Sequence, residues 1–121
     1  MPSMLTRIQF LGAVRQVTGS RYLLQSNGQS ILVDCGMFQE RDYLERNWER
    51  PTFDPRRLDA VLLTHAHIDH CGLLPRLVRQ GFRGPIYATP ATRELAALVL
   101  QDSAQIQAED AAFKAKRHRR E

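Results

Sequence analysis

The chain of 121 residues has few cysteines and no long apolar run, and both features narrow its class. Cys35 and Cys71 are too few for a disulfide framework, and a reducing compartment would keep both as thiols. No segment approaches the roughly 18 apolar residues of a membrane span. The start MPSMLTRIQF lacks the basic and apolar pattern of a signal peptide. These features indicate a cytoplasmic globular protein with no membrane partner.

Lysine is nearly absent, and the net charge of +4 arises at the C-terminal end of the chain. Basic and acidic residues balance elsewhere, whereas the last eight residues carry an excess of positive charge. The five basic residues there are Lys114, Lys116, Arg117, Arg119 and Arg120. Such a run can hold phosphates, and it is also typical of a solvated chain end. The sequence leaves both interpretations open.

The first third of the chain predicts three strands. Leu5–Leu11 alternates partly and ends at a glycine, and Arg21–Gln25 and Ser30–Asp34 follow as a second and third strand. Asn27-Gly28 between the latter two is a strong hairpin signal, because both positions of the turn need a positive φ. Ala60–Thr64 is a continuous apolar run, as expected for a strand that is covered on both faces.

The remaining segments predict mainly helix. Residues 39–50 are polar and fit a short helix or a loop, and residues 73–78 have apolar residues at helical spacing. A proline in the first turn and a glycine just past the end support that second helix. Ile86–Ala88 is a short strand, and Ala91–Arg120 contains no glycine or proline and predicts a long helix. We expect its apolar stripe to lie in the core: Leu95, Leu98, Val99, Ile106 and Phe113.

Strands and helices that follow one another in this order favour an α/β architecture with helices packed on a sheet. In such sheets, ligands bind where a strand ends and a helix begins. The end of the Ala60–Thr64 strand is therefore the expected site.

That position carries the sequence HAHIDH, in which three imidazoles and a carboxylate fall within six residues. These are ligand types that zinc takes. On a helix, His65 and His67 would point about 200° apart, whereas a tight turn after a strand can aim both at one ion. Asp69 and His70 can then reach a second ion, and two metals about 3.5–4 Å apart can act together on a phosphodiester. Cys71 is expected to be a small buried hydrophobe and not a further ligand.

These residues resemble a known superfamily. HAHIDH matches the HxHxDH signature of the metallo-β-lactamase-fold hydrolases, and ILVDCG is similar to the strand that supplies their conserved aspartate. GAVRQVTGS, DCGMFQ and PIYATPAT resemble the bacterial β-CASP nucleases, a branch related to ribonuclease J and to the endonuclease of eukaryotic cleavage and polyadenylation. The resemblance implies part of a four-layer αββα sandwich, two zinc ions and an RNA substrate.

Carried over by position, the resemblance makes His65 and His67 ligands of one zinc and Asp69 and His70 ligands of the other. Asp69 and Asp34 would be the catalytic carboxylates, with Asp34 orienting ligand histidines through hydrogen bonds. Asp34 could equally cap nearby backbone amides. The backbone of Gly19 and Ser20 would either approach the scissile phosphate or form an ordinary turn.

The family's remaining ligands have no counterpart here, because the fourth histidine, His118, lies in the basic tail without a matching motif. We therefore expect residues 1–121 to be the N-terminal part of a metallo-β-lactamase domain without the β-CASP domain. Such a piece would bind zinc weakly and hydrolyse RNA negligibly, whereas the parent would be a hydrolase and could form a homo-oligomer. Two alternatives stay open: a hydrolase of thioesters, lactones or lactams, and a non-catalytic module that binds RNA through its basic tail.

Overall fold

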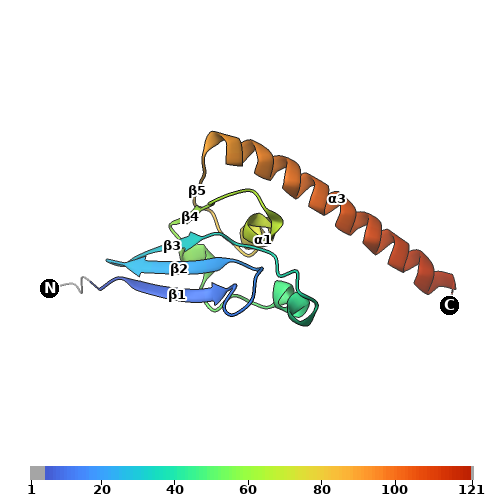
Figure 1. Ribbon diagram of the computed structural model, residues 1–121, viewed down its shortest axis with the longest axis horizontal. Coiled ribbons are helices and arrows are strands. Elements are labelled where there is room, and N and C mark those ends of the chain that lie inside the picture. Colours follow the sequence, from blue (N-terminus) through green and yellow to red (C-terminus); the bar gives the residue numbers. More distant parts are fainter. Residues whose placement is uncertain (1–4, 121) are drawn as a thin grey trace.

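The computed structural model describes residues 5–120 and contains one five-stranded sheet with the order β1-β2-β3-β4-β5 (Figure 1). The first three strands pair antiparallel, and β4 and β5 extend the sheet in parallel to β3. The strands are β1 (Arg7–Gly12), β2 (Arg21–Ser26), β3 (Gln29–Val33), β4 (Ala60–Leu62) and β5 (Ile86–Tyr87). A mixed sheet followed by helices confirms the α/β prediction.

The hairpin between β2 and β3 forms where the sequence predicts it. Asn27 and Gly28 have φ values of 52° and 75°, and Ser26 pairs directly with Gln29 across the turn. Asparagine and glycine tolerate this left-handed backbone, which most other residues avoid. The turn thereby sets the register of the central strands.

The helices fall mainly on the C-terminal side of β4 in the chain. Two are short 3-10 helices, η1 (Arg41–Trp48) and η2 (Pro55–Arg57), and three are α-helices: α1 (Ile68–Cys71), α2 (Leu74–Arg79) and α3 (Pro90–Arg120). α2 has Pro75 in its first turn and Gly81, with a φ of 114°, beyond its end, as predicted.

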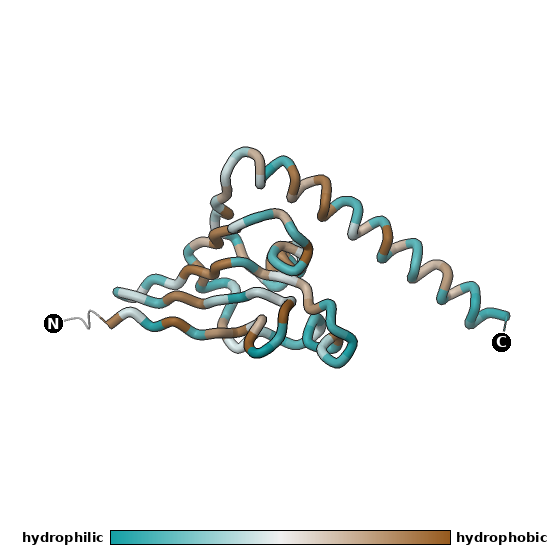
Figure 2. Tube along the Cα trace, in the orientation of Figure 1, coloured by the Kyte–Doolittle hydropathy of each residue, from teal (hydrophilic) through white to brown (hydrophobic). Residues whose placement is uncertain are grey.

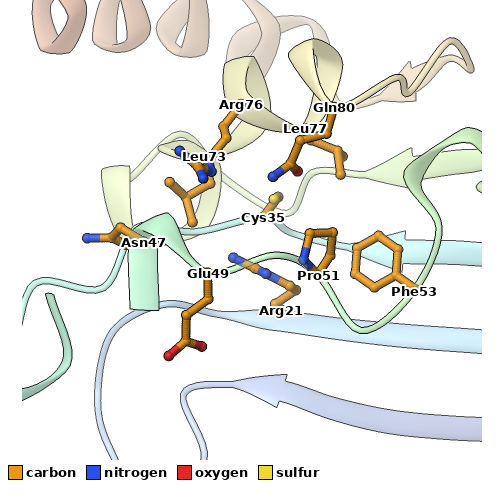
Figure 3. Close-up of a pocket in the computed structure, with 10 residues that line it drawn as sticks. All are labelled: Arg21, Cys35, Asn47, Glu49, Pro51, Phe53, Leu73, Arg76, Leu77 and Gln80. Atoms are coloured by element: carbon orange, nitrogen blue, oxygen red, sulfur yellow. The ribbon is translucent and has the colours of Figure 1, made fainter. Parts of the chain in front are cut away.

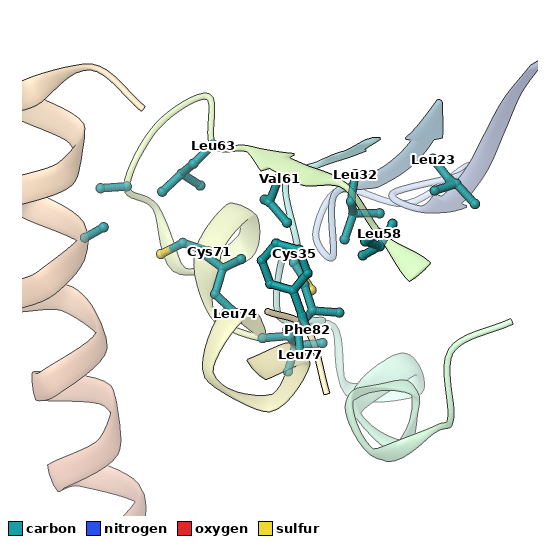
Figure 4. Packing of buried hydrophobic residues seen from close by; sticks show 13 residues of the cluster. Leu23, Leu32, Cys35, Leu58, Val61, Leu63, Cys71, Leu74, Leu77 and Phe82 are labelled. Carbon is teal, nitrogen blue, oxygen red and sulfur yellow. The ribbon is translucent and has the colours of Figure 1, made fainter. Parts of the chain in front are cut away.

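One face of the sheet carries the hydrophobic core. Leu23, Leu32 and Val61 lie side by side in register on β2, β3 and β4, and each is at most 1% exposed. Figure 4 shows them facing Leu77 and Phe82, which come from α2 and the loop after it. Fully burying one such side chain contributes about 1.5–3 kcal/mol. This packing fixes the strand β4 that leads into the predicted site.

The opposite face of the sheet is apolar and open. Its cross-strand row contains Phe10, Tyr22, Val33, Leu62 and Tyr87. Phe10 is 65% exposed, Leu62 38% and Tyr87 58%. The expectation that the Ala60–Thr64 segment is covered on both faces is therefore wrong, because helices cover only one of them. One covered and one open apolar face fit part of a layered sandwich.

The long helix α3 departs from the expected core position. Leu95, Leu98, Ile106 and Phe113 are 50–67% exposed, and the buried residues of the helix are Thr92 and Ala96 near its start. After its first turns α3 runs away from the sheet (Figure 1), and apolar positions recur along it (Figure 2). The prediction that its stripe is core is therefore wrong, with Val99 as the partly buried exception. Within residues 5–120, no helix combines the length and apolar character required to cross a bilayer.

Candidate metal centre

The HAHIDH segment leaves the carboxyl end of β4, at the predicted place. His65 and His67 lie in the extended connection, and His67 precedes the first turn of α1 with φ −78° and ψ 146°. Asp69 and His70 belong to α1 itself. The change from extended to helical backbone lets residues of both parts gather at one edge of the sheet.

Asp34 links this segment to the end of β3. Its carboxylate is 2% exposed and accepts three hydrogen bonds, from Thr64 N at 2.8 Å, Thr64 Oγ1 at 2.7 Å and His70 Nδ1 at 2.7 Å. Its φ of 61° is left-handed, a conformation in which aspartate is enriched among non-glycine residues. Asp34 thus contacts a backbone amide and a histidine ring together.

These hydrogen bonds determine which ring nitrogens can bind a metal. Asp34 is an acceptor, so a neutral His70 donates from Nδ1 and carries its lone pair on Nε2. Thr64 gives its single hydroxyl proton to Asp34, and its oxygen lies 2.9 Å from His65 Nδ1. His65 must therefore also donate from Nδ1, and in the neutral ring this leaves the lone pair on Nε2. Both rings are held in the tautomer that a metal ligand needs.

The candidate ligands lie close together, and the His65 ring is nearer to His70 than to His67. The ring centroids of His65 and His67 are 4.7 Å apart, those of His65 and His70 are 3.8 Å apart, and His70 Nε2 lies 3.5 Å from Asp69 Oδ2. Across residues 5–120, no three or more histidine, cysteine or acidic side chains converge on one metal position. The donor types, imidazole nitrogen and carboxylate oxygen, are those that zinc takes.

Backbone contacts hold the segment against two neighbouring loops. Asp69 O accepts from Ser20 N at 2.9 Å, and His70 O accepts from Cys35 N at 2.9 Å. A Cβ on Gly36 would lie 1.6 Å from Asp69 O, so only glycine allows this approach. Gly19 is buried and has a φ of 81°. The structure therefore brings Ser20 next to Asp69 as a backbone support, and Gly19 precedes it in the same loop.

Glu40 fastens the loop between β1 and β2 at the same edge of the sheet. Its carboxylate accepts hydrogen bonds from the backbone amides of Val17 and Thr18, both at 2.8 Å, and from the Thr18 hydroxyl. The hydroxyl bond from Thr18 is the main reason that the pKa of Glu40 falls from 4.5 to about 2. Ala13 and Arg15 in this loop have positive φ values, so the loop depends on such external contacts.

Both cysteines are free thiols of the core. Cys35 is 3% exposed and Cys71 is fully buried, which confirms the expectation that Cys71 is a small buried hydrophobe. Burial raises the pKa of Cys35 to about 11, because the interior disfavours the thiolate. Burial also raises the pKa of Cys71.

A small cavity lies on the other side of Cys35, between η1 and α2 (Figure 3). Its volume of about 10 Å³ leaves room for roughly one water. The Nε atoms of Arg21 and Arg76 are buried without a hydrogen-bond partner, and both residues line this cavity. None of the four candidate ligands lines it, so it is separate from the metal centre.

Sequence reasoning missed part of this arrangement. The bridging role of Thr64 depends on how two loops meet, and nothing in its neighbours along the chain indicates it. Glu40 and Thr18 are 22 residues apart, so the sequence around either residue does not indicate their hydrogen bonds. Gly36 ends the DCG sequence that begins with Asp34. A glycine at this position could have suggested a close backbone approach.

Comparisons with known proteins agree with this geometry. The model of the metallo-beta-lactamase superfamily matches residues 14–116. Ribonuclease TTHA0252 of Thermus thermophilus is 53% identical over 100 residues, which cover 83% of this chain and 23% of the relative. Transcription termination factor FttA of Methanocaldococcus jannaschii is 41% identical over 101 residues, covering 83% of this chain and 16% of the relative.

A solved structure supports the fold. Human tRNase Z, short form, aligns with a TM-score of 0.53 at 24% identity, covering 83% of this chain and 40% of the human chain. The chain spans less than a quarter of the length of the Thermus and Methanocaldococcus relatives. The family match covers most of the chain and includes the whole candidate metal centre. The chain therefore belongs to the metallo-β-lactamase superfamily, whose members bind metal ions.

Proposed function

We propose that this chain is part of a zinc-dependent hydrolase that cleaves RNA phosphodiester bonds. The observation that carries the proposal is the hydrogen-bond chain from Asp34 to His70 and, through Thr64, to His65. That chain leaves two imidazole Nε2 lone pairs free beside a carboxylate. A bound zinc pair would supply hydroxide at neutral pH and offset the charge that develops on phosphate.

Each residue has a distinct part in this proposal. His65 and His67 would hold one ion, and Asp69 and His70 would hold the second. Asp34 is a positioning residue, because it contacts the His70 ring and the Thr64 amide and not the reacting atoms. Its buried carboxylate keeps the proton of His70 on Nδ1.

The names of the proteins that are similar in sequence make RNA the preferred substrate class. The proteins that are 53% and 41% identical are named a ribonuclease and a transcription termination factor. These names favour RNA over thioester, lactone or lactam substrates. Ser20 N donates to Asp69 O, so an RNA phosphate at the metals would lie near the backbone of Gly19 and Ser20. This contact is part of the proposal.

A chimera tests the proposal and allows for the short length of the chain. The matching 100 residues of the Thermus ribonuclease are replaced by those of this chain, and cleavage of a labelled RNA is followed with zinc present. The proposal predicts a metal-dependent nuclease. His67→Ala should lower the cleavage rate at least about 100-fold and leave RNA binding intact. If the graft includes position 118, the exposed control His118→Ala should change neither cleavage nor binding.

Two results would contradict the proposal. One is a chimera that folds, as judged by circular dichroism, and cleaves RNA equally well after His67→Ala. The other is a folded chimera that hydrolyses a thioester or lactam and leaves RNA intact.

A further inference from the structure

The last turns of α3 form an exposed basic surface. Figure 1 shows α3 extending away from the sheet, and residues 111–120 are all exposed. Within residues 5–120, no basic side chain of this segment forms an ion pair. Among the residues that the structure describes, these cations therefore have no ionic partner. They are Lys114, Lys116, Arg117, Arg119 and Arg120.

An aromatic side chain lies among these cations. Phe113, Lys116, Arg117 and Arg120 are spaced i, i+3, i+4 and i+7, so they share one side of the helix, here called the Phe113 face. Phe113 is 67% exposed and belongs to no part of the hydrophobic core. The Phe113 face therefore combines a solvent-exposed ring with three positive charges.

Helix stability explains only part of this surface. Cations in the last turn interact favourably with the negative end of the helix dipole, typically by 0.3–1 kcal/mol each. That effect accounts for Arg117, Arg119 and Arg120, which lie in the last turn. Leu95, Leu98 and Ile106 of the same helix are exposed as well, and Phe113 differs from them in carrying an aromatic ring beside the cations. A ligand with both an aromatic face and negative charge matches the whole surface.

We propose that the Phe113 face binds single-stranded RNA. A base would stack on Phe113, and the neighbouring phosphates would contact Lys116, Arg117 and Arg120. Every base offers a π-face, so this binding would tolerate different sequences. A duplex keeps its bases stacked inside and would bind less well. Only the choice of RNA over other single-stranded nucleic acids depends on the proposed function.

The acidic residues of α3 limit the path of the strand. Glu109 and Asp110 lie three to four residues before Phe113, which places them about one helical turn closer to the sheet. Their charge repels phosphate. The RNA backbone should therefore run from Phe113 toward the end of the helix and not toward residues 106–110.

The experiment measures binding of a fluorescein-labelled 12-nucleotide oligouridine to the full chain by anisotropy, with EDTA present so that no cleavage occurs. Phe113→Leu keeps an apolar side chain without the π-face and should weaken binding about 5- to 100-fold. Phe113→Trp should retain or improve affinity. The matched control is Ile106→Ala, which truncates an exposed apolar residue on the same helix and should change affinity less than twofold. Circular dichroism checks that each variant keeps its helix.

Salt dependence separates the charges from the ring. Replacing Lys116, Arg117 and Arg120 together by glutamine should reduce the slope of log K against log salt by about 2, whereas Phe113→Leu should leave the slope unchanged. The proposal is wrong if Phe113→Leu binds oligouridine like the unmodified chain. It is also wrong if the chain binds phosphatidylserine vesicles and not RNA. Binding in EDTA is independent of cleavage, so failure here and failure of the proposed nuclease activity are distinguishable.

Discussion

Replacing Asp34 by asparagine tests how the metal centre is organised. The carboxylate accepts three hydrogen bonds within 2.7–2.8 Å, and an amide can accept at only one of its two positions. If the amide nitrogen faces His70, the ring must accept at Nδ1 and carry its proton on Nε2. The nitrogen proposed to bind zinc would then be blocked.

The expected magnitudes follow from this geometry. Losing a hydrogen bond to a charged acceptor costs about 1.5–3 kcal/mol of stability. Substituting a residue that orients a metal-bound histidine reduces metal affinity about 10- to 100-fold. Isothermal titration with zinc and urea unfolding measure the two effects. Asp59→Asn is the control, because Asp59 is exposed and, within residues 5–120, its carboxylate accepts only from Ser30 N, at 2.7 Å.

The reasoning is refuted if Asp34→Asn binds zinc within twofold of the unmodified chain. It is also refuted if Asp59→Asn weakens zinc binding equally, because the effect would then come from charge alone.

Three further perturbations test the surroundings of the centre. Gly36→Ala should lower the free energy of unfolding by at least about 1–3 kcal/mol, since its Cβ would overlap Asp69 O; an effect well below about 1 kcal/mol would contradict this. The pKa of Glu40 is lowered to about 2, so its carboxylate stabilises the fold fully above pH 4.5 and loses this effect as pH falls through 2. The stability difference from Glu40→Gln should shrink over that range, and a difference independent of pH would exclude the anchor. Cys35 and Cys71 should resist iodoacetamide at pH 8 until the chain unfolds, and rapid labelling of the native protein, read by mass spectrometry, would show that the thiols are accessible.

Local signals in the sequence predicted the features that neighbouring residues determine. Asn27-Gly28 specified the hairpin because few other residue pairs accept two positive φ values. The glycine past α2 and the ligand-rich segment after β4 were readable for the same reason: each depends on a few adjacent residues.

The errors arose where distant segments decide the outcome. The apolar residues of α3 had helical spacing, yet the helix leaves the sheet and exposes Leu98 and Phe113. Leu62 looked buried because the run around it is apolar, but only one face of the sheet has a cover. Hydrophobic periodicity reports which side of an element is apolar, and it does not report whether another element covers that side.

Zinc titration followed by NMR of the imidazole resonances tests the central claim most directly. The chain has four histidines, and His118 on the exposed end of α3 serves as an internal control. The account predicts that the resonances of His65, His67 and His70 shift or broaden together while those of His118 stay unchanged. Equal perturbation of all four histidines, or of His118 alone, would contradict a metal centre at the end of β4.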